Sequence, residues 1–276
     1  MKPLLKWAGG KRHIADKLFA YFPDDWNQGT YYEPFIGGAA LFLHIQPSNA
    51  VIADFNTKLT NFYSQVKVNA EELFFEISKI ALEFNSEISE NKRDYFLNLR
   101  SRFNEANSNT IESAVLLYVL NKLCFNGLYR ENAKGQFNVP FGQKKKFPEL
   151  AKEDFFNASQ LLKSTSIINA DFEETLKNAK QGDFVYFDPP YIPVDATSSF
   201  TSYHAEGFTQ EDQMRLSKLM SELASRGIKA ICSNSDTEVT RKIYGQLNQK
   251  TVVAPRMVSA KSSGRGMISE LVISNF

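Results

Sequence analysis

The chain has 276 residues, of which 43% are hydrophobic and 23% are charged, values typical of one large globular domain or of a core with an insertion. Its two cysteines lie far apart and have no cysteine or histidine at ligand spacing, which argues against a disulfide framework and structural zinc. With a net charge of +1, no apolar leader and no apolar run near the roughly 20 residues of a membrane helix, the chain is expected in the prokaryotic cytoplasm.

Short runs of β-branched and aromatic residues recur along the chain, and each ends at a polar residue near a turn former. They predict buried strands at 31–34, 51–54, 167–171, 184–188 and 230–234, and a last strand over 268–274. A helical pattern over 210–226 stops at Gly227. Its apolar positions are Met214, Leu216, Leu219, Met220 and Leu223. Strands that alternate with helices predict an α/β fold with a mostly parallel sheet.

The interval between the second and third strands, residues 57–164, has a different character. It is rich in helix formers and acids, contains an apolar helix over 111–123, and then becomes basic with several glycines and prolines. We therefore predict a largely helical insertion that ends in an irregular basic arm. Residues 1–56 and 165–276 would form the core.

The charged residues are unevenly distributed. Residues 241–269 contain six lysines and arginines and no acid, and residues 130–152 contain six against two acids. The stretch 71–113 has nine acids against five bases. A neutral total can therefore hide a basic face that suits an acidic partner. Ordinary solvated lysines explain any single run equally well.

Acidic residues follow the predicted strands at the points where they end. Glu33, Asp54, Asp171 and Asp188 all lie there. Ligands of open parallel sheets bind outside the carboxyl ends of the strands, at the switch point of strand order. Four neighbouring carboxylates would form a pocket for hydroxyls, amines or cations. Asp54 is suitably placed to accept hydrogen bonds from ribose hydroxyls, and capping the helix that follows is its alternative role.

A short glycine segment follows the first predicted strand. Phe35 precedes Gly37 and Gly38 on the way into a helix, as in a nucleotide-binding turn, because glycine lets the backbone approach a ligand closely. A plain turn is the alternative interpretation.

The segment Asp188-Pro189-Pro190-Tyr191 is more specific. Two prolines fix φ and withhold two N–H donors, which leaves carbonyl acceptors beside an ionised carboxylate. Such a site suits an amino group. The ring of Tyr191 offers a flat face on which an aromatic base can stack, worth about 1–3 kcal/mol.

Taken together, these segments resemble those of the Dam-type DNA adenine-N6 methyltransferases, over nearly the whole chain. The matching motifs are LKWAGGK at 5–11, EPFIGG at 33–38, IADFN at 52–56, FNGLYR at 125–130, GQFNVPFG at 135–142, DPPY at 188–191, FTSYH at 200–204 and SNS at 233–235. The resemblance implies a Rossmann-like, S-adenosylmethionine-dependent methyltransferase core with a helical target-recognition insertion. It implies the product S-adenosylhomocysteine and no metal.

The resemblance also implies roles for residues at the rim of the sheet. Positions matching Trp7 and Lys11 help to enclose the cofactor, Asp54 takes its ribose, Asp171 and Phe172 lie by its adenine, and Asp188 lies between cofactor and target. The cofactor set is completed by Glu33, Phe35, Gly37 and Gly38. Ala39 departs from the family pattern, which has glycine there. We expect Gly38 to keep the turn flexible and cofactor binding to survive.

The same motifs suggest a mechanism without metal or covalent intermediate. The lone pair of adenine N6 is delocalised into the ring, so Asp188 and the Pro189 carbonyl are expected to accept its two hydrogens and localise it. The base must first leave the duplex, at a cost of a few kcal/mol, and stack on Tyr191.

The basic arm is expected to read the target sequence. Arg130 can bind a guanine edge, while Leu128 and Pro140 can contact a thymine methyl group. The lysines are expected to neutralise phosphates. The DNA-binding set comprises Lys6, Phe125, Asn126, Leu128, Arg130, Pro140, Lys144, Lys145 and Lys146. By resemblance the target is GATC, with Lys6 near its first guanine and Arg130 near its last base pair. A phosphate clamp is the alternative role of Arg130.

Three competing functions remain compatible with the residues. They are methylation of cytosine N4, methylation of adenine in RNA, and a non-catalytic DNA-binding regulator that retains the fold. The expected partner is double-stranded DNA, bound by a monomer, with no membrane association. A cognate restriction enzyme is compatible with this function.

Overall fold

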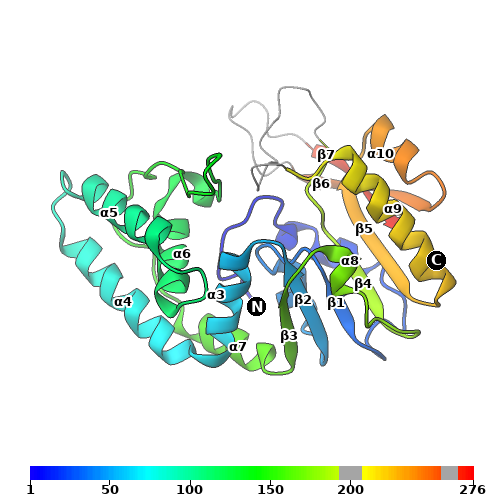
Figure 1. The fold of residues 1–276 in the computed structure, drawn as a ribbon, viewed down its shortest axis with the longest axis horizontal. Coiled ribbons are helices and arrows are strands. Elements are labelled where there is room, and N and C mark those ends of the chain that lie inside the picture. The colour runs from blue at the N-terminus through cyan, green and yellow to red at the C-terminus, as the bar shows by residue number, and fades with distance from the viewer. Residues whose placement is uncertain (193–206, 256–266) are drawn as a thin grey trace.

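In a computed structural model, the structure describes residues 1–192, 207–255 and 267–276. The motif at 200–204 and the basic loop at 259–266 lie outside the described residues. The described chain folds around one sheet, with a group of helices beside it (Figure 1).

The sheet has seven strands in the order β3-β2-β1-β4-β5-β7-β6. The strands are β1 (Tyr31–Glu33), β2 (Ala50–Asp54), β3 (Thr165–Asn169), β4 (Phe184–Phe187), β5 (Lys229–Ser235), β6 (Asn248–Pro255) and β7 (Met267–Ser274). The first five pair in parallel, whereas β7 is antiparallel to both β5 and β6. The predicted α/β fold with a mostly parallel sheet is confirmed. The strand β6 was not predicted, because its first four residues are polar and it lacks the apolar run by which the other strands were recognised.

The helices occupy three regions of the chain. The first region holds a 3₁₀ turn η1 (Lys11–His13), α1 (Ala15–Phe19) and α2 (Ala40–Ile45). The insertion holds α3 (Thr57–Val68), α4 (Ala70–Ser86), α5 (Lys92–Glu105), α6 (Ile111–Leu123), a 3₁₀ turn η2 (Phe125–Gly127) and α7 (Lys152–Leu162). The last region holds α8 (Phe172–Thr175), α9 (Gln210–Ser225) and α10 (Glu238–Ile243).

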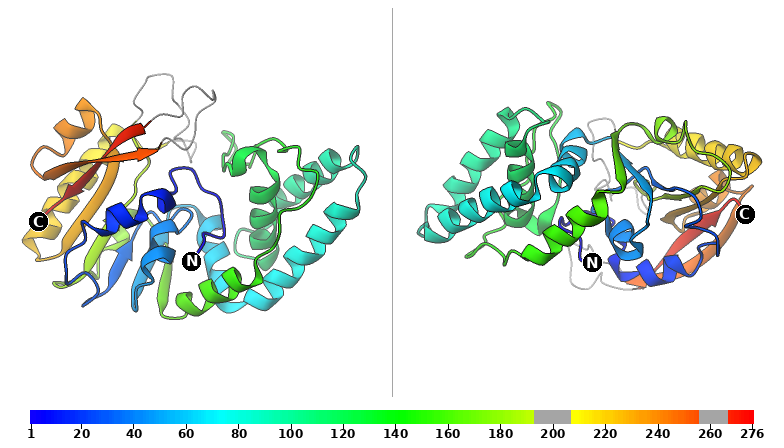
Figure 2. Two further views of the ribbon diagram at one scale, coloured as in Figure 1. Left: turned by 180° about the vertical axis from the view of Figure 1, so that it is seen from behind. Right: turned by 90° about the horizontal axis from the view of Figure 1, so that it is seen from below.

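Side-chain alternation divides the sheet into two apolar faces. Along β4, Val185 and Phe187 pack into a cluster with α8, α9 and α10, while Phe184 and Tyr186 face a cluster on the other side. The two views of Figure 2 show α9 and α1 on opposite sides of the sheet. Every one of these four strand residues is buried, which explains the uninterrupted apolar run in the sequence.

The helices of the insertion form the connection between the parallel strands β2 and β3, in place of a simple crossover. The apolar helix α6 is buried on nearly all sides and packs against α3, α4 and α5. Its side chains belong to the same hydrophobic cluster as Tyr31 and Ile52 of the sheet. The sheet and the insertion therefore share one continuous core.

The strand order places the switch point between β1 and β4. From β1 the chain passes to β2 and then β3 on one side, and β4 and β5 extend the sheet on the other. Parallel strands separate at such a point and leave a crevice at their carboxyl ends. The ends of β1 and β4 carry Glu33 and Asp188.

One detail of the helical prediction was wrong. Met214 was assigned to the apolar face of α9 but is 51% exposed. The buried side chain at that level is Gln213, which lines up with Leu216, Met220 and Leu223 at helical spacing.

Candidate active site at the switch point

Asp188 follows the last residue of β4 and lies at the switch point, 20% exposed. Its Oδ1 atom is 2.8 Å from Nζ of Lys11 and accepts a hydrogen bond of 3.2 Å from the hydroxyl of Ser233. The sequence predicted a site with acceptors and no donors, whereas the structure places two donors, Lys11 and Ser233, on this carboxylate. They are there because a buried carboxylate needs charge and hydrogen-bond partners inside the protein.

Lys11 comes from the 3₁₀ turn η1 and is 4% exposed. Its ammonium also donates to the carbonyl of Gly9 and lies 4.5 Å from the centre of the Tyr191 ring. The sequence assigned Lys11 to the cofactor. In the structure it joins the carboxylate and the ring of the DPPY segment.

Burial governs the ionisation of the acids at the switch point. It raises the pKa of Asp188, an effect that Lys11 and Ser233 oppose and the charge of Glu270 reinforces. Burial likewise raises the pKa of Glu33 to about 8, against the hydrogen bond of 2.6 Å that its Oε2 accepts from Tyr31. Two carboxyl groups near one another in a dry site thus hold protons more readily than in water.

The other residues of the DPPY segment are held by the neighbouring elements. The Tyr191 hydroxyl donates to Oε2 of Glu270 on β7 at 2.8 Å. The carbonyl of Pro190 accepts from Nε2 of Gln213 at 2.9 Å. Of the two proline carbonyls predicted as acceptors for a ligand, the second is therefore already bonded within the protein.

Sequence reasoning missed Gln213, Ser233 and Glu270 as site residues. Each was visible as a polar side chain at a position where the pattern of its helix or strand calls for an apolar one. A buried polar group needs a partner, so such positions point to a site.

The glycine turn after β1 is held by a hydrogen bond to Asp54, the last residue of the neighbouring strand β2. Asp54 accepts from the backbone N–H of Gly37 at 3.2 Å and of Asn56 at 3.0 Å. Asn56, not Asp54, caps α3, through a hydrogen bond from the N–H of Leu59. The alternative role of Asp54 as a helix cap is therefore wrong.

Trp7 lies directly over this turn. A Cβ atom at Gly37 would be 2.9 Å from Cδ1 of Trp7, and Gly37 has φ of +45°, so only glycine fits there without strain. Trp7 itself stacks on Tyr129 of the insertion, with ring centres 5.1 Å apart. Gly38 is as close to Trp7 but does not have a positive φ.

Ala39 is the second residue of the turn, after Gly37, whose backbone has left-handed angles. Its φ is +56° and it is buried. The sequence expectation that Gly38 would relieve this position is not how the turn is built, because the unusual backbone angles fall on residues 37 and 39. The alanine at 39 holds a conformation that costs L-residues roughly 1–2 kcal/mol.

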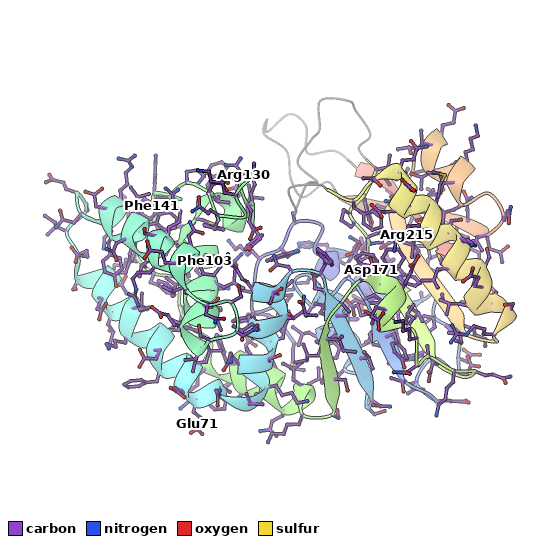
Figure 3. The ribbon with its side chains drawn as sticks, in the orientation of Figure 1. Glu71, Phe103, Arg130, Phe141, Asp171 and Arg215 are labelled. Atoms are coloured by element: carbon purple, nitrogen blue, oxygen red, sulfur yellow. The ribbon has the colours of Figure 1, made fainter. Side chains whose placement is uncertain are left out.

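An aromatic pair and an ion cluster lie at the end of β3. The rings of Phe35 and Phe172 stack with centres 5.5 Å apart. Arg215 of α9 pairs with Asp171, Glu173 and Asp212, and Figure 3 shows it beside Asp171. Its guanidinium lies 4.9 Å from the centre of the Phe172 ring. Asp171 also caps α8.

The basic arm, residues 124–146, contains no regular strand, as the sequence predicted, and two isolated bridges fold it into a hairpin. Isolated bridges join Cys124 to Phe141 and Glu131 to Phe137. Nε of Arg130 donates to Oδ1 of Asn138 at 2.7 Å, and Figure 3 shows Arg130 at the outer edge of this hairpin.

The predicted DNA contacts are mostly accessible on this hairpin. Its candidates Phe125, Asn126, Arg130, Pro140, Lys145 and Lys146 are exposed, and Leu128 and Lys144 are half-buried. Phe125 in particular is 52% exposed, so its ring is accessible to a partner.

Lys6 joins the hairpin to the core through a buried amide. Asn121 of α6 accepts from the N–H of Lys6 at 2.9 Å and donates to the carbonyls of Lys6 and Gly127 at 2.7 and 3.1 Å. The side chain of Lys6 is exposed. The segment before η1 thus lies between the candidate catalytic residues and the candidate DNA contacts.

In the part of the chain that the structure describes, no three histidine, cysteine or acidic side chains gather as ligands for a metal ion. No described helix is both long and apolar enough to cross a bilayer.

The sheet order and the proline-flanked carboxylate at its switch point define a ligand-binding α/β protein of the Rossmann-like kind. The family model of D12 class N6 adenine-specific DNA methyltransferases matches residues 7–258. The chain belongs to this family and is an adenine-specific DNA methyltransferase.

Several related proteins match this chain over nearly their whole length. A type II methyltransferase of Lactococcus lactis subsp. cremoris is 42% identical, over 100% of this chain and 96% of the relative. A type II methyltransferase of Methanocaldococcus jannaschii is 38% identical, over 100% and 99%. A DNA adenine methylase of Escherichia coli K12 is 31% identical, over 98% and 94%. The resemblance noted in the sequence is confirmed, and with it a family that uses S-adenosylmethionine.

Proposed function

We propose that this enzyme methylates N6 of the adenine in GATC sequences of double-stranded DNA, and that Asp188 is the residue that receives the target amino group. The observation that carries the proposal is the carboxylate of Asp188, with its proline turn, at the crevice between β1 and β4. Acceptors placed there can bind the two hydrogens of an amino group while its lone pair is left exposed.

The rim beside Asp188 fits S-adenosylmethionine. Asp54 supplies a carboxylate that is suited to ribose hydroxyls, and the glycine turn beneath Trp7 leaves no room for a side chain at Gly37. Phe35, which is half-buried and stacks on the buried Phe172, offers aromatic surface for an adenine ring. When bound, the cofactor supplies a methyl group already activated as part of a sulfonium. In this proposal the cofactor site also includes Lys11, Glu33, Gly38 and Asp171.

In the proposed mechanism Asp188 and the Pro189 carbonyl bind the N6 hydrogens and localise the nitrogen lone pair. The Lys11 ammonium lies on Oδ1 of Asp188, so in this proposal the second carboxylate oxygen, Oδ2, accepts from the target amino group. The pKa of Asp188 is raised by burial, which makes its carboxylate a better acceptor for the proton that N6 must lose. The extruded base would stack on Tyr191.

The hairpin of the insertion would read the sequence. Arg130 is exposed, and its Nε and Nη2 donate to Asn138, so Nη1 is the nitrogen that would approach a guanine first. The lysines at 144–146 would contact phosphates. In this proposal residues 57–164 are the target-recognition domain, residues 1–56 and 165–276 are the catalytic core, and a monomer acts on DNA.

The test is to incubate unmethylated plasmid with protein and S-adenosylmethionine and to map modified bases by sequencing. The proposal expects N6-methyladenine in GATC and its absence with Asp188→Ala, which should still bind DNA. Methylation in another sequence would overturn the proposed target. A wild-type protein that binds the cofactor and DNA but transfers nothing would point to a regulator.

Two relatives are named type II methyltransferases, which makes a cognate restriction enzyme a further partner in this proposal. Plasmid that has been methylated to completion should then resist an endonuclease that cuts the mapped sequence. Cleavage of that plasmid at an unchanged rate would remove this partner from the proposal.

A further inference from the structure

Gln213 is a buried amide in the first turn of α9. Its side chain occupies the apolar stripe that continues through Leu216, Met220 and Leu223, and it is 1% exposed. Burying an amide without partners costs roughly 1–3 kcal/mol in proteins, so the hydrogen bonds it makes should explain why a polar residue stands there.

The orientation of this amide is fixed by its neighbours. Its Oε1 accepts from Nδ2 of Asn234 at 2.9 Å and from the hydroxyl of Tyr244 at 2.7 Å. The amide of Asn234 is itself fixed, because its Oδ1 accepts from the N–H of Ser235 at 2.9 Å. Two donors on Oε1 leave Nε2 as the only group of Gln213 that can face the DPPY segment.

Nε2 of Gln213 donates to the carbonyl of Pro190 at 2.9 Å. The proline ring already fixes φ of residue 190, so its ψ, which sets the direction of the carbonyl and of Tyr191, is the remaining soft angle. The hydrogen bond fixes that angle. Beyond Tyr191, the carbonyl of Ile192 accepts from the hydroxyl of Ser235 at 2.7 Å.

We propose that Gln213 is a positioning residue of the enzyme: it holds the Pro190 carbonyl against α9, so that Asp188 and Tyr191 face the target base. The inference rests on the proposed role of Asp188. Gln213 touches neither the base nor the cofactor in this proposal. It acts through the peptide between Pro190 and Tyr191, and its loss would let that peptide rotate and misplace both side chains.

The sharpest test is Gln213→Glu, compared with the wild type across pH. A protonated glutamic acid can still accept from Asn234 and Tyr244 and can donate to the Pro190 carbonyl. An ionised one places a carboxylate oxygen against the Pro190 carbonyl, and neither of these two groups can donate. The ratio of variant to wild-type kcat should therefore fall by roughly tenfold or more from pH 6 to pH 9, as the carboxyl ionises.

Among the residues that the structure describes, the titratable neighbours of Gln213 are Tyr244 and Cys232, and burial raises the pKa of each above the range tested. Lys11, Glu33, Asp188 and Glu270 lie in the active site and are present in both proteins, so the ratio removes their contribution. Thermal unfolding at each pH corrects for any loss of folded protein.

A second readout is independent of methyl transfer. DNA with 2-aminopurine at the target position brightens when the base leaves the stack, and Gln213→Met, which cannot donate to Pro190, should reduce that signal about fivefold or more at saturating DNA. Met214→Leu, at the exposed neighbouring position, should match the wild type. The KM for DNA should change little, because the contacts of the hairpin are intact.

The proposal is overturned if Gln213→Met keeps kcat and the fluorescence signal within about twofold of wild type, or if Gln213→Glu shows a flat ratio across pH. It is also overturned if the lost activity equals the lost folded fraction. Failure of the proposed function is distinct: wild-type protein would then methylate no adenine, while the fluorescence comparison would still decide the role of Gln213.

Discussion

The Lys11 ammonium lies 2.8 Å from Oδ1 of Asp188, so the carboxylate assigned to the target base is already paired within the protein. Lys11 is 4% exposed and Asp188 is 20% exposed. A cation in this place neutralises the acid while no base is bound. The amino group of an entering base is neutral, so it would add hydrogen bonds to this carboxylate without taking over the charge of Lys11.

This pair should be measurable in the unfolding free energy. Lys11→Met leaves a largely buried carboxylate without its cation, and we expect a loss on the order of 3 kcal/mol at pH 7. Asp188→Asn in the same protein should recover part of the loss, giving a coupling energy above about 1 kcal/mol in a urea double-mutant cycle. Lys145→Met, at an exposed lysine, is the control. Additive losses would show that the pair contributes no coupling.

The Tyr191 ring should matter more than its hydroxyl. Tyr191→Ala removes a stacking surface worth about 1–3 kcal/mol, so both turnover and 2-aminopurine fluorescence should fall steeply. Tyr191→Phe and Tyr191→Trp should keep much of both. Phe loses the hydrogen bond to Glu270, so Glu270→Leu, which removes the acceptor, should resemble it. Equal loss in Ala, Phe and Trp variants would remove stacking from the mechanism.

The raised pKa of Glu33 should make the protein less stable as pH rises. Folded Glu33 keeps its proton up to about pH 8, while the unfolded chain releases it near 4.5. Between these values the folded state binds more protons, so the unfolding free energy falls by up to about 1.4 kcal/mol per pH unit.

Glu33→Gln should remove this part of the slope and stabilise the protein more at pH 8 than at pH 5, measured by urea unfolding. The amide oxygen can still accept from Tyr31. Glu149→Gln, at an exposed acid, should leave the slope unchanged. Asp188 has a pKa raised in the same direction, so a smaller slope of the same sign should persist. An unchanged slope in Glu33→Gln would contradict this assignment.

Ala39 allows a test of the glycine turn. Ala39→Gly relieves the left-handed backbone but loses a buried methyl, so these effects should nearly cancel, to within about 1 kcal/mol. Ala39→Val adds a β-branched side chain at the same angles and should cost at least about 2 kcal/mol and weaken cofactor binding. Calorimetric titration with S-adenosylhomocysteine and thermal unfolding measure both. Equal stability of the Gly and Val variants would show that the turn is not strained.

Arg130 and Asn138 should act together on sequence preference. If Arg130 binds a guanine edge, Arg130→Ala should relax preference at one base pair, by about 1–3 kcal/mol. Asn138→Ala frees the guanidinium and should have a smaller effect at the same base pair. Methylation rates on duplexes with single substitutions in the target measure this. A uniform loss on every duplex would make Arg130 a phosphate clamp.

The sequence predicted the parallel strands and the residues at their ends because both follow from local signals. The strand over Phe184–Phe187 is apolar throughout, and DPPY after it fixes its own backbone. The apolar helix of the insertion was predicted at the bounds that α6 has, since its composition needs burial on all sides.

What the sequence could not provide were pairings between distant segments. Nothing local indicates that Lys11 would bind Asp188, or that Gln213 would bind Pro190, because each pair is brought together by the sheet. The irregular character of the arm around Arg130 was predicted, but its two isolated bridges were not, since they join residues separated by glycine and proline turns. The exposed Met214 shows how a helical face is misjudged when a buried polar residue takes the apolar position.

The hydrophobic cluster that runs unbroken from β1 through α3 and α6 limits how such an enzyme can evolve a new specificity. A substitution inside that cluster weakens both halves of the molecule at once, so it lowers activity on all DNA alike. Exposed positions on the hairpin can vary without that penalty. Divergence among related enzymes should therefore be concentrated there, while the shared interior changes slowly.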